Sequence, residues 1–103
     1  MDGFIRIADI DQIPDDEGFV AEVEGKEVAI FRCAGEFFAV ENYCPHRGGP
    51  VAEGEYEEGV VACPWHAWPF DVRSGKCMIN DSARLATYEV RLEAGHLWVK
   101  ASA

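Results

Sequence analysis

Two short segments that combine cysteine with histidine restrict this chain more than any other feature. Residues 44–46 read Cys-Pro-His and residues 63–66 read Cys-Pro-Trp-His, with the sixteen residues 47–62 between them. Two thiolates and two imidazoles suit either zinc or an iron–sulfur cluster. Because each segment offers one ligand of each type, the sequence predicts a metal site held by the four side chains of Cys44, His46, Cys63 and His66.

The mixed ligands of each segment favour a binuclear centre over a zinc finger. A zinc finger usually has two cysteines on one turn and two histidines, three to five residues apart, on a helix. Pro45 and Pro64 disfavour a helix in either segment. If both sulfurs bind one iron and both imidazoles bind the other, two similar loops can hold the two ends of a [2Fe-2S] cluster, as in a Rieske centre. Zinc bound by the same four residues remains the alternative.

These segments and their flanks resemble a Rieske-type ferredoxin. The motifs are Cys-Pro-His-Arg-Gly-Gly-Pro from Cys44, Gly-Val-Val leading into Cys-Pro-Trp-His at Cys63, and Phe-Asp-Val-Arg-Ser-Gly from Phe70. More narrowly, nearly the whole chain resembles the ferredoxin components of bacterial multicomponent ring-hydroxylating oxygenases and the Rieske-like small subunits of nitrite reductases. The resemblance implies one [2Fe-2S] cluster, with Cys44 and Cys63 on the inner iron. It places His46 and His66 on the outer, solvent-facing iron.

The resemblance implies a function in electron transfer. We expect a soluble one-electron carrier with a low-potential cluster that passes electrons from an NAD(P)H-dependent reductase to a terminal oxygenase, and that is not an enzyme alone. The sequence shows no Ser/His/Asp arrangement, no nucleotide-binding glycine loop and no second His/His/carboxylate site for iron. Two alternatives remain open. One is an electron-transfer small subunit of a nitrite-reductase-like complex, and the other, from a different class, is a zinc-stabilised interaction module.

The resemblance also implies a low redox potential. In high-potential Rieske proteins of respiratory complexes, a disulfide joins the ligand loops, and a serine and a tyrosine hydroxyl donate hydrogen bonds toward the cluster. The positions that match the disulfide are Gly49 and Trp65, and those that match the hydroxyls are Trp68 and Phe70. Since none of the four can supply the required group, we expect a potential near the low end of the Rieske range, roughly −150 mV.

Length and charge fit a small acidic carrier. The 103 residues predict one domain, 1–103. The chain has nine basic and nineteen acidic residues, so its net charge is −10. This negative charge argues against nucleic-acid binding. No basic segment precedes an apolar stretch at the N-terminus, and no run is long enough for a membrane span, so we expect a cytoplasmic protein without membrane contact. We also expect it to be a monomer. Cys33 and Cys77 are expected to be free thiols, the first in the core and the second partly exposed.

The hydrophobic pattern predicts an all-β fold of short strands. Strands are expected at 4–7, 19–23, 28–33, 37–40, 60–62, 69–72, 85–92 and 97–100, a helical turn at 9–14, and turns at 25–26, 34–35, 74–75 and 94–95. Strands at this spacing indicate an antiparallel β-sandwich or small barrel. The resemblance supports the same fold and adds a cluster-binding subdomain of two loops, at about 43–50 and 63–70.

The acidic segment 53–58 allows two interpretations. Its charges, and the glycines at 54 and 59, favour a solvated loop. A docking face for a basic surface on a redox partner is the alternative.

Two positions depart from the wider family pattern. Ala67 stands where many Rieske domains have glycine after the second ligand histidine, and residues 78–83 contain no proline where those domains have a proline-bearing loop. Both departures affect the expected shape around the cluster and leave the ligand assignment as it is.

Overall fold

Three antiparallel sheets make up the fold of the computed structural model, which describes residues 3–15, 17–44, 49–64, 67–80 and 82–100. The elements are β1 (Phe4–Asp9), η1 (Ile10–Gln12), β2 (Phe19–Val23), β3 (Lys26–Cys33), β4 (Glu36–Glu41), η2 (Val51–Glu53), β5 (Tyr56–Glu57), β6 (Val60–Ala62), β7 (Pro69–Asp71), β8 (Thr87–Tyr88), β9 (Val90–Glu93) and β10 (His96–Lys100). The sheet orders are β1-β10-β9, β2-β3-β4-β8 and β5-β6-β7. The predicted all-β fold is confirmed, and none of the three described sheets closes into a barrel.

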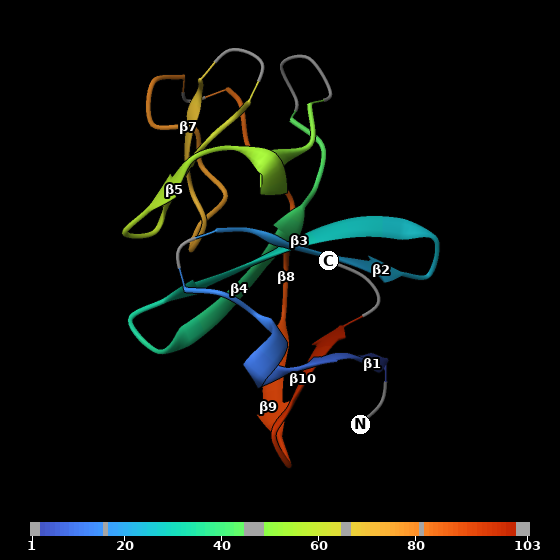
Figure 1. Ribbon diagram of the computed structural model, residues 1–103. Helices are drawn as coiled ribbons and strands as arrows, with labels where there is room; N and C mark the ends of the chain where they lie inside the picture. Colours follow the sequence, from blue (N-terminus) through green and yellow to red (C-terminus); the bar gives the residue numbers. More distant parts are fainter. Residues whose placement is uncertain (1–2, 16, 45–48, 65–66, 81, 101–103) are drawn as a thin grey trace.

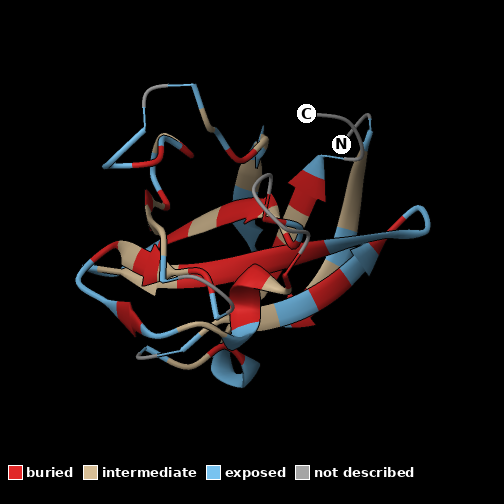
Figure 2. Ribbon diagram, turned by 90° about the horizontal axis from the view of Figure 1, so that it is seen from above, coloured by how far each residue is buried: buried red, intermediate tan, exposed pale blue. Residues whose placement is uncertain are grey.

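The three sheets form successive layers (Figure 1). The sheet β2-β3-β4-β8 lies in the middle, and its strand β3 is buried on both faces because Val28, Ala29, Ile30 and Phe31 are all inaccessible to solvent. Val28 and Ile30 pack toward the sheet of β10, whereas Ala29 and Phe31 pack toward β5, β6 and β7. Figure 2 shows this concentration of buried residues along the middle strands. The alternation of side chains along β3 thus joins two hydrophobic clusters across one strand.

Tight turns with two residues of positive φ connect four of the strand pairs. In the turn between β3 and β4, Ala34 has φ 53° and Gly35 has φ 81°. Both residues of a type I′ turn need positive φ, and its twist suits a two-residue hairpin. The turns at 24–25, 58–59 and 94–95 have the same pattern of a side-chain residue followed by glycine. The turn predicted at 25–26 therefore lies one residue earlier.

Two sequence predictions are wrong in detail. The strand expected over 85–92 is divided into β8 and β9, because Thr87 and Tyr88 pair with β4 while Val90 onward pairs with β10. The segment 53–58, expected as a loop, contains β5, which pairs with β6. The helical turn is confirmed as η1, where the Asp9 amide donates to the Gln12 side chain over 3.0 Å.

No helix in the described part of the chain is long and apolar enough to cross a membrane.

Candidate metal centre

The sheet β5-β6-β7 holds the second predicted ligand loop. Strand β6 ends at Ala62, directly before Cys63, and β7 begins at Pro69, where Pro69 pairs with Ala62. The inward side chains of the three strands, Tyr56, Val61 and Phe70, are buried. The loop therefore starts and ends on two neighbouring strands that the core holds in place.

Both predicted loops close in the same way. The Cys44 amide donates to the Gly49 carbonyl, and the Cys63 amide donates to the Trp68 carbonyl, with an N···O distance of 2.9 Å in each. Donor and acceptor are five residues apart in both loops. The two cysteine segments thus begin and end equivalently, as expected if two similar loops hold opposite ends of one centre.

The two cysteines of these loops share one buried environment. Cys44 is 0% exposed and Cys63 is 1% exposed, and both belong to the hydrophobic cluster that contains Phe31 and Phe70. An anionic thiolate in such surroundings is costly unless a cation accompanies it. Two soft sulfur donors from separate loops, buried together, fit a centre that takes them as anionic ligands.

The two predicted imidazole ligands, His46 and His66, lie outside the described residues, as do Arg47, Gly48 and Trp65. Among the residues that are described, no three potential ligand side chains gather at one metal position. The structure therefore places Cys44 and Cys63 in one hydrophobic cluster, and the two histidine ligands remain predictions.

Ala67 adopts a left-handed backbone conformation within the second loop. Its φ is 56°, and its amide donates to the Cys63 carbonyl over 2.7 Å. A side-chain residue in this region carries a penalty that glycine avoids. This explains physically why glycine suits the position after the second ligand histidine.

Replacing Ala67 with glycine is therefore expected to stabilise the protein by about 0.5–1 kcal/mol, because the relief of the left-handed strain exceeds the entropy cost of glycine. Urea denaturation monitored by circular dichroism measures this free energy of unfolding. Ala94→Gly, at φ 54° in the turn before β10, is the matched control far from the loops. If Ala94→Gly stabilises the protein and Ala67→Gly destabilises it, the Ala67 backbone conformation described above is wrong.

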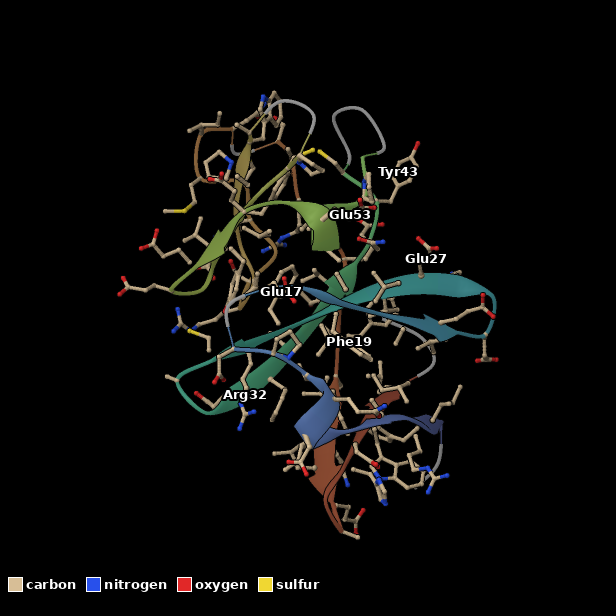
Figure 3. All side chains as sticks on the ribbon, in the orientation of Figure 1. Glu17, Phe19, Glu27, Arg32, Tyr43 and Glu53 are labelled. Carbon is tan, nitrogen blue, oxygen red and sulfur yellow. The ribbon has the colours of Figure 1, made fainter. Side chains whose placement is uncertain are left out.

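Asn42 ties the first loop to the body of the protein, a role that no pattern in the sequence indicated. It is the one buried polar side chain among the described residues, at 7% exposed. Its Oδ1 accepts a hydrogen bond from the Ala52 amide at 2.7 Å, and its Nδ2 donates to Glu27 Oε1 at 3.1 Å. Asn42 therefore links the chain just before Cys44 to the chain just after the loop. The neighbouring Tyr43 is 62% exposed and projects outward (Figure 3).

Tyr56 fixes the edge strand β5 to the middle sheet. Its hydroxyl donates to the Arg32 carbonyl at 2.8 Å, and its ring centroid lies 4.7 Å from that of Phe31. Burial, followed by the nearby thiol of Cys33, raises the pKa of Tyr56 to about 12, so the hydroxyl remains a donor at neutral pH. The alternation of Glu55, Tyr56 and Glu57 beside the strand-like residues 60–62 was the signal that could have predicted this strand.

The other two cysteines contribute no disulfide. Cys77 is 3% exposed, so the prediction of partial exposure is wrong: its amide donates to the Ala83 carbonyl, and its backbone forms a bridge with Phe70. Cys33 was predicted to lie in the core but is only half-buried at the end of β3, where its sulfur accepts a hydrogen bond from Arg73 Nη2 at 3.0 Å.

The family of the chain follows from a comparison with known domains. Residues 3–89 match the model of the Rieske [2Fe-2S] domain. The chain belongs to this family. The ferredoxin component of the naphthalene 1,2-dioxygenase/salicylate 5-hydroxylase systems of Ralstonia sp is 32% identical over 98 residues, which cover 94% of each chain. The biphenyl dioxygenase ferredoxin subunit of Pseudomonas sp. strain KKS102 is 35% identical over 92 residues, covering 87% of this chain and 84% of its own.

A solved Rieske structure has the same fold over nearly its whole length. The ferredoxin of carbazole 1,9a-dioxygenase from Nocardioides aromaticivorans IC177 superimposes with a TM-score of 0.89 at 25% sequence identity, and the match covers 97% of this chain and 98% of that one. The resemblance to a Rieske-type ferredoxin is thereby confirmed. With it are confirmed the [2Fe-2S] cofactor and the role of an electron carrier that is not an enzyme alone.

Proposed function

We propose that residues 1–103 form one Rieske domain, that Cys44, His46, Cys63 and His66 hold its cluster, and that the protein carries single electrons from an NAD(P)H-dependent reductase to a terminal oxygenase. The observation that carries the ligand assignment is the equivalent closure of two loops whose cysteines lie in one buried cluster. Each histidine follows its cysteine inside one of these loops in the sequence.

The choice of partner rests on the relatives. The two aligned above are named as ferredoxin components of naphthalene and biphenyl dioxygenase systems. An oxygenase that receives electrons one at a time needs a carrier, and the carrier in turn needs a reductase. We place this exchange in the cytoplasm, where NAD(P)H is available, and expect the carrier to act as a monomer.

The protein's own residues prepare the site for this exchange. The cluster, when bound, accepts and releases one electron, and its histidine ligands raise its potential above that of a four-cysteine ferredoxin. Phe31, Val61 and Phe70 surround the cysteine side of the site with apolar groups and exclude water there. Asn42 and Tyr56 hold the first loop and β5 by hydrogen bonds to the backbone of other segments. A site held in this way needs little rearrangement when the charge changes by one unit.

The side chains around the cysteines also support a low potential. Phe70 is fully buried in the hydrophobic cluster that contains Cys44 and Cys63, and Trp68 packs against that hydrophobic cluster. Neither side chain carries a hydroxyl, and these are the positions that match the hydroxyl donors of high-potential Rieske proteins. The expected potential is therefore roughly −150 mV. Protein-film voltammetry tests the proposal, and a potential well above zero would contradict it.

Phe70→Tyr is expected to raise the potential by about 65–130 mV. A hydrogen bond to a charged acceptor is worth roughly 1.5–3 kcal/mol, and it favours the more negative, reduced state. Phe31→Tyr is the control, because it adds a hydroxyl to the same hydrophobic cluster from β3 instead of the ligand sheet. If both variants lose stability and neither changes the potential, a hydroxyl at position 70 does not reach the iron–sulfur cluster.

A further inference from the structure

The outward face of the sheet β5-β6-β7 has an apolar centre that the protein covers only in part. Tyr56, Val61 and Phe70 point inward and are buried. By strand alternation, Val60, Ala62 and Pro69 lie on the opposite face, where all three are half-buried. Ala62 and Pro69 directly border the loop 63–68. This face therefore lies beside the predicted cluster ligands.

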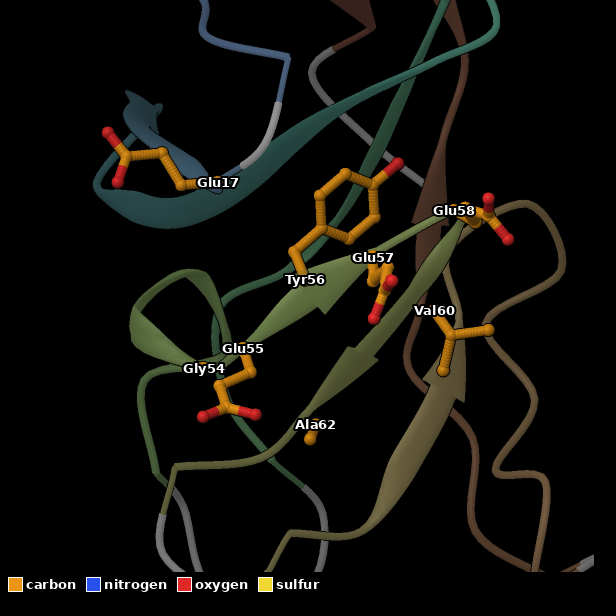
Figure 4. A pocket seen from close by; sticks show the side chains of 8 residues that line it. All are labelled: Glu17, Gly54, Glu55, Tyr56, Glu57, Glu58, Val60 and Ala62. Atoms are coloured by element: carbon orange, nitrogen blue, oxygen red, sulfur yellow. The ribbon is translucent and has the colours of Figure 1, made fainter.

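One side of this face is strongly acidic. An open groove along β5 and β6 has Val60 and Ala62 among its lining residues, together with the carboxylates of Glu17, Glu55, Glu57 and Glu58 (Figure 4). None of these four carboxylates forms an ion pair or hydrogen bond with another side chain in the described part of the protein. Their charges are thus directed to solvent around an apolar floor, where cations from another molecule would be attracted.

The opposite side of the face is apolar. The Met78 amide donates to the Pro69 carbonyl at 2.8 Å, so the segment after β7 extends the row formed by Ala62 and Pro69. Met78 is 61% exposed and Ile79 is 66% exposed. In Figure 1 this orange segment runs beside β7, at the end of the molecule away from β9. Exposed apolar side chains such as Met78 and Ile79, close to the predicted ligand loop 63–68, are typical of a contact surface.

We infer that Glu55, Glu57, Glu58, Val60, Ala62, Pro69, Met78 and Ile79 form a docking face for the protein that receives the electron, and that this partner presents an apolar patch bordered on one side by lysine or arginine. The inference rests on the proposed function. The acidic side accelerates encounter with the partner and sets its orientation, and the apolar side holds the complex together once water is excluded. Because the two sides differ in charge, they favour one orientation of the partner over the reverse one.

Reduction of cytochrome c, a basic haem protein, provides the probe. The holoprotein is reduced with dithionite under anaerobic conditions and mixed with ferric cytochrome c in a stopped-flow instrument, where one electron passes to each ferric haem. Glu55, Glu57 and Glu58 replaced together by glutamine should lower the second-order rate at low salt about tenfold and flatten its salt dependence. Met78→Ser with Ile79→Ser should lower the rate several-fold at every salt concentration.

Matched variants on other surfaces separate docking from overall charge. Glu22, Glu24 and Glu93 are all exposed, and replacing them by glutamine changes the net charge by the same three units. Leu92→Ser removes an apolar side chain, 52% exposed, from β9. Both controls should leave the rate near the wild-type value. Iron content and reduction potential, measured for every variant, show whether the site is intact.

Two results would count against the inference in different ways. If the variants on the docking face keep their iron and potential and react no more slowly than the controls, the docking face is wrong while the proposed function stands. A wild-type protein that lacks the cluster would overturn the proposed function, and the inference with it.

Discussion

Cys63→Ala is expected to abolish cluster assembly completely and to lower the free energy of unfolding. Cys63 and Cys44 are both buried in the same hydrophobic cluster, and the proposed metal centre would join their two loops. Without one sulfur ligand the two loops lose the centre that joins them, and stability supplied by metal binding is lost with it. Iron and sulfide analysis of the purified variant, with urea denaturation, measures both effects. His66→Ala should give the same loss of cluster.

Ligands of the same chemical type elsewhere in the chain provide the controls. Cys77→Ala also removes a buried sulfur, and His96→Ala removes the one histidine outside the two loops. Both should retain a full complement of iron and sulfide, although Cys77→Ala will cost some stability through lost packing. Loss of the cluster in either control, or its survival in Cys63→Ala, would show that the four proposed ligands are wrongly assigned.

Gly54→Ala is expected to destabilise the protein by about 3 kcal/mol or more. A methyl group at Gly54 would overlap the carbonyl oxygen of Ala62, the residue directly before Cys63. Backbone atoms cannot move aside as a flexible side chain can, so β6 has to shift away from η2 and β5. Overpacking of this kind costs roughly 1–3 kcal/mol and more where backbone must move. Because β6 carries Cys63, the iron content should fall as well.

Gly25→Ala is the matched control for this substitution. Gly25 lies in the turn between β2 and β3, with φ 83° and no neighbouring atom within 4 Å of an added methyl group. It should cost about 1–2 kcal/mol through backbone strain alone and leave the iron content unchanged. Urea denaturation gives both free energies. Equal costs for Gly54→Ala and Gly25→Ala would contradict the close packing of Gly54 against Ala62.

Local patterns were sufficient to predict most of the strands. Alternation along residues 19–23 and 28–33, separated by a glycine turn, gave a hairpin that the structure confirms as β2 and β3. At Glu89 the chain passes from one sheet to another, because β8 pairs with β4 and β9 pairs with β10. This change was not predictable, since polar and apolar residues alternate without a break over residues 87–93 while the two partner strands lie far apart in the sequence. Pairing partners depend on the three-dimensional fold, which a single alternating segment does not specify.

The candidate site shows the same division. The ligand types and their spacing could be recognised in the sequence because metal chemistry restricts them closely. The supports of the site could not. Asn42 resembles any turn residue, and its role depends on an amide ten positions away at Ala52. Gly54 and Tyr56 lay within a segment whose charges favoured a solvated loop, although Tyr56 packs on Phe31 and Gly54 on Ala62.

Metal and sulfide analysis with electron paramagnetic resonance tests the central claim most directly. The protein, prepared anaerobically with iron supplied, should be red-brown, contain two irons and two acid-labile sulfides per chain, and give a rhombic signal after reduction, as expected of a [2Fe-2S] centre with two histidine ligands. A colourless protein with one tightly bound zinc per chain and no sulfide would contradict the account.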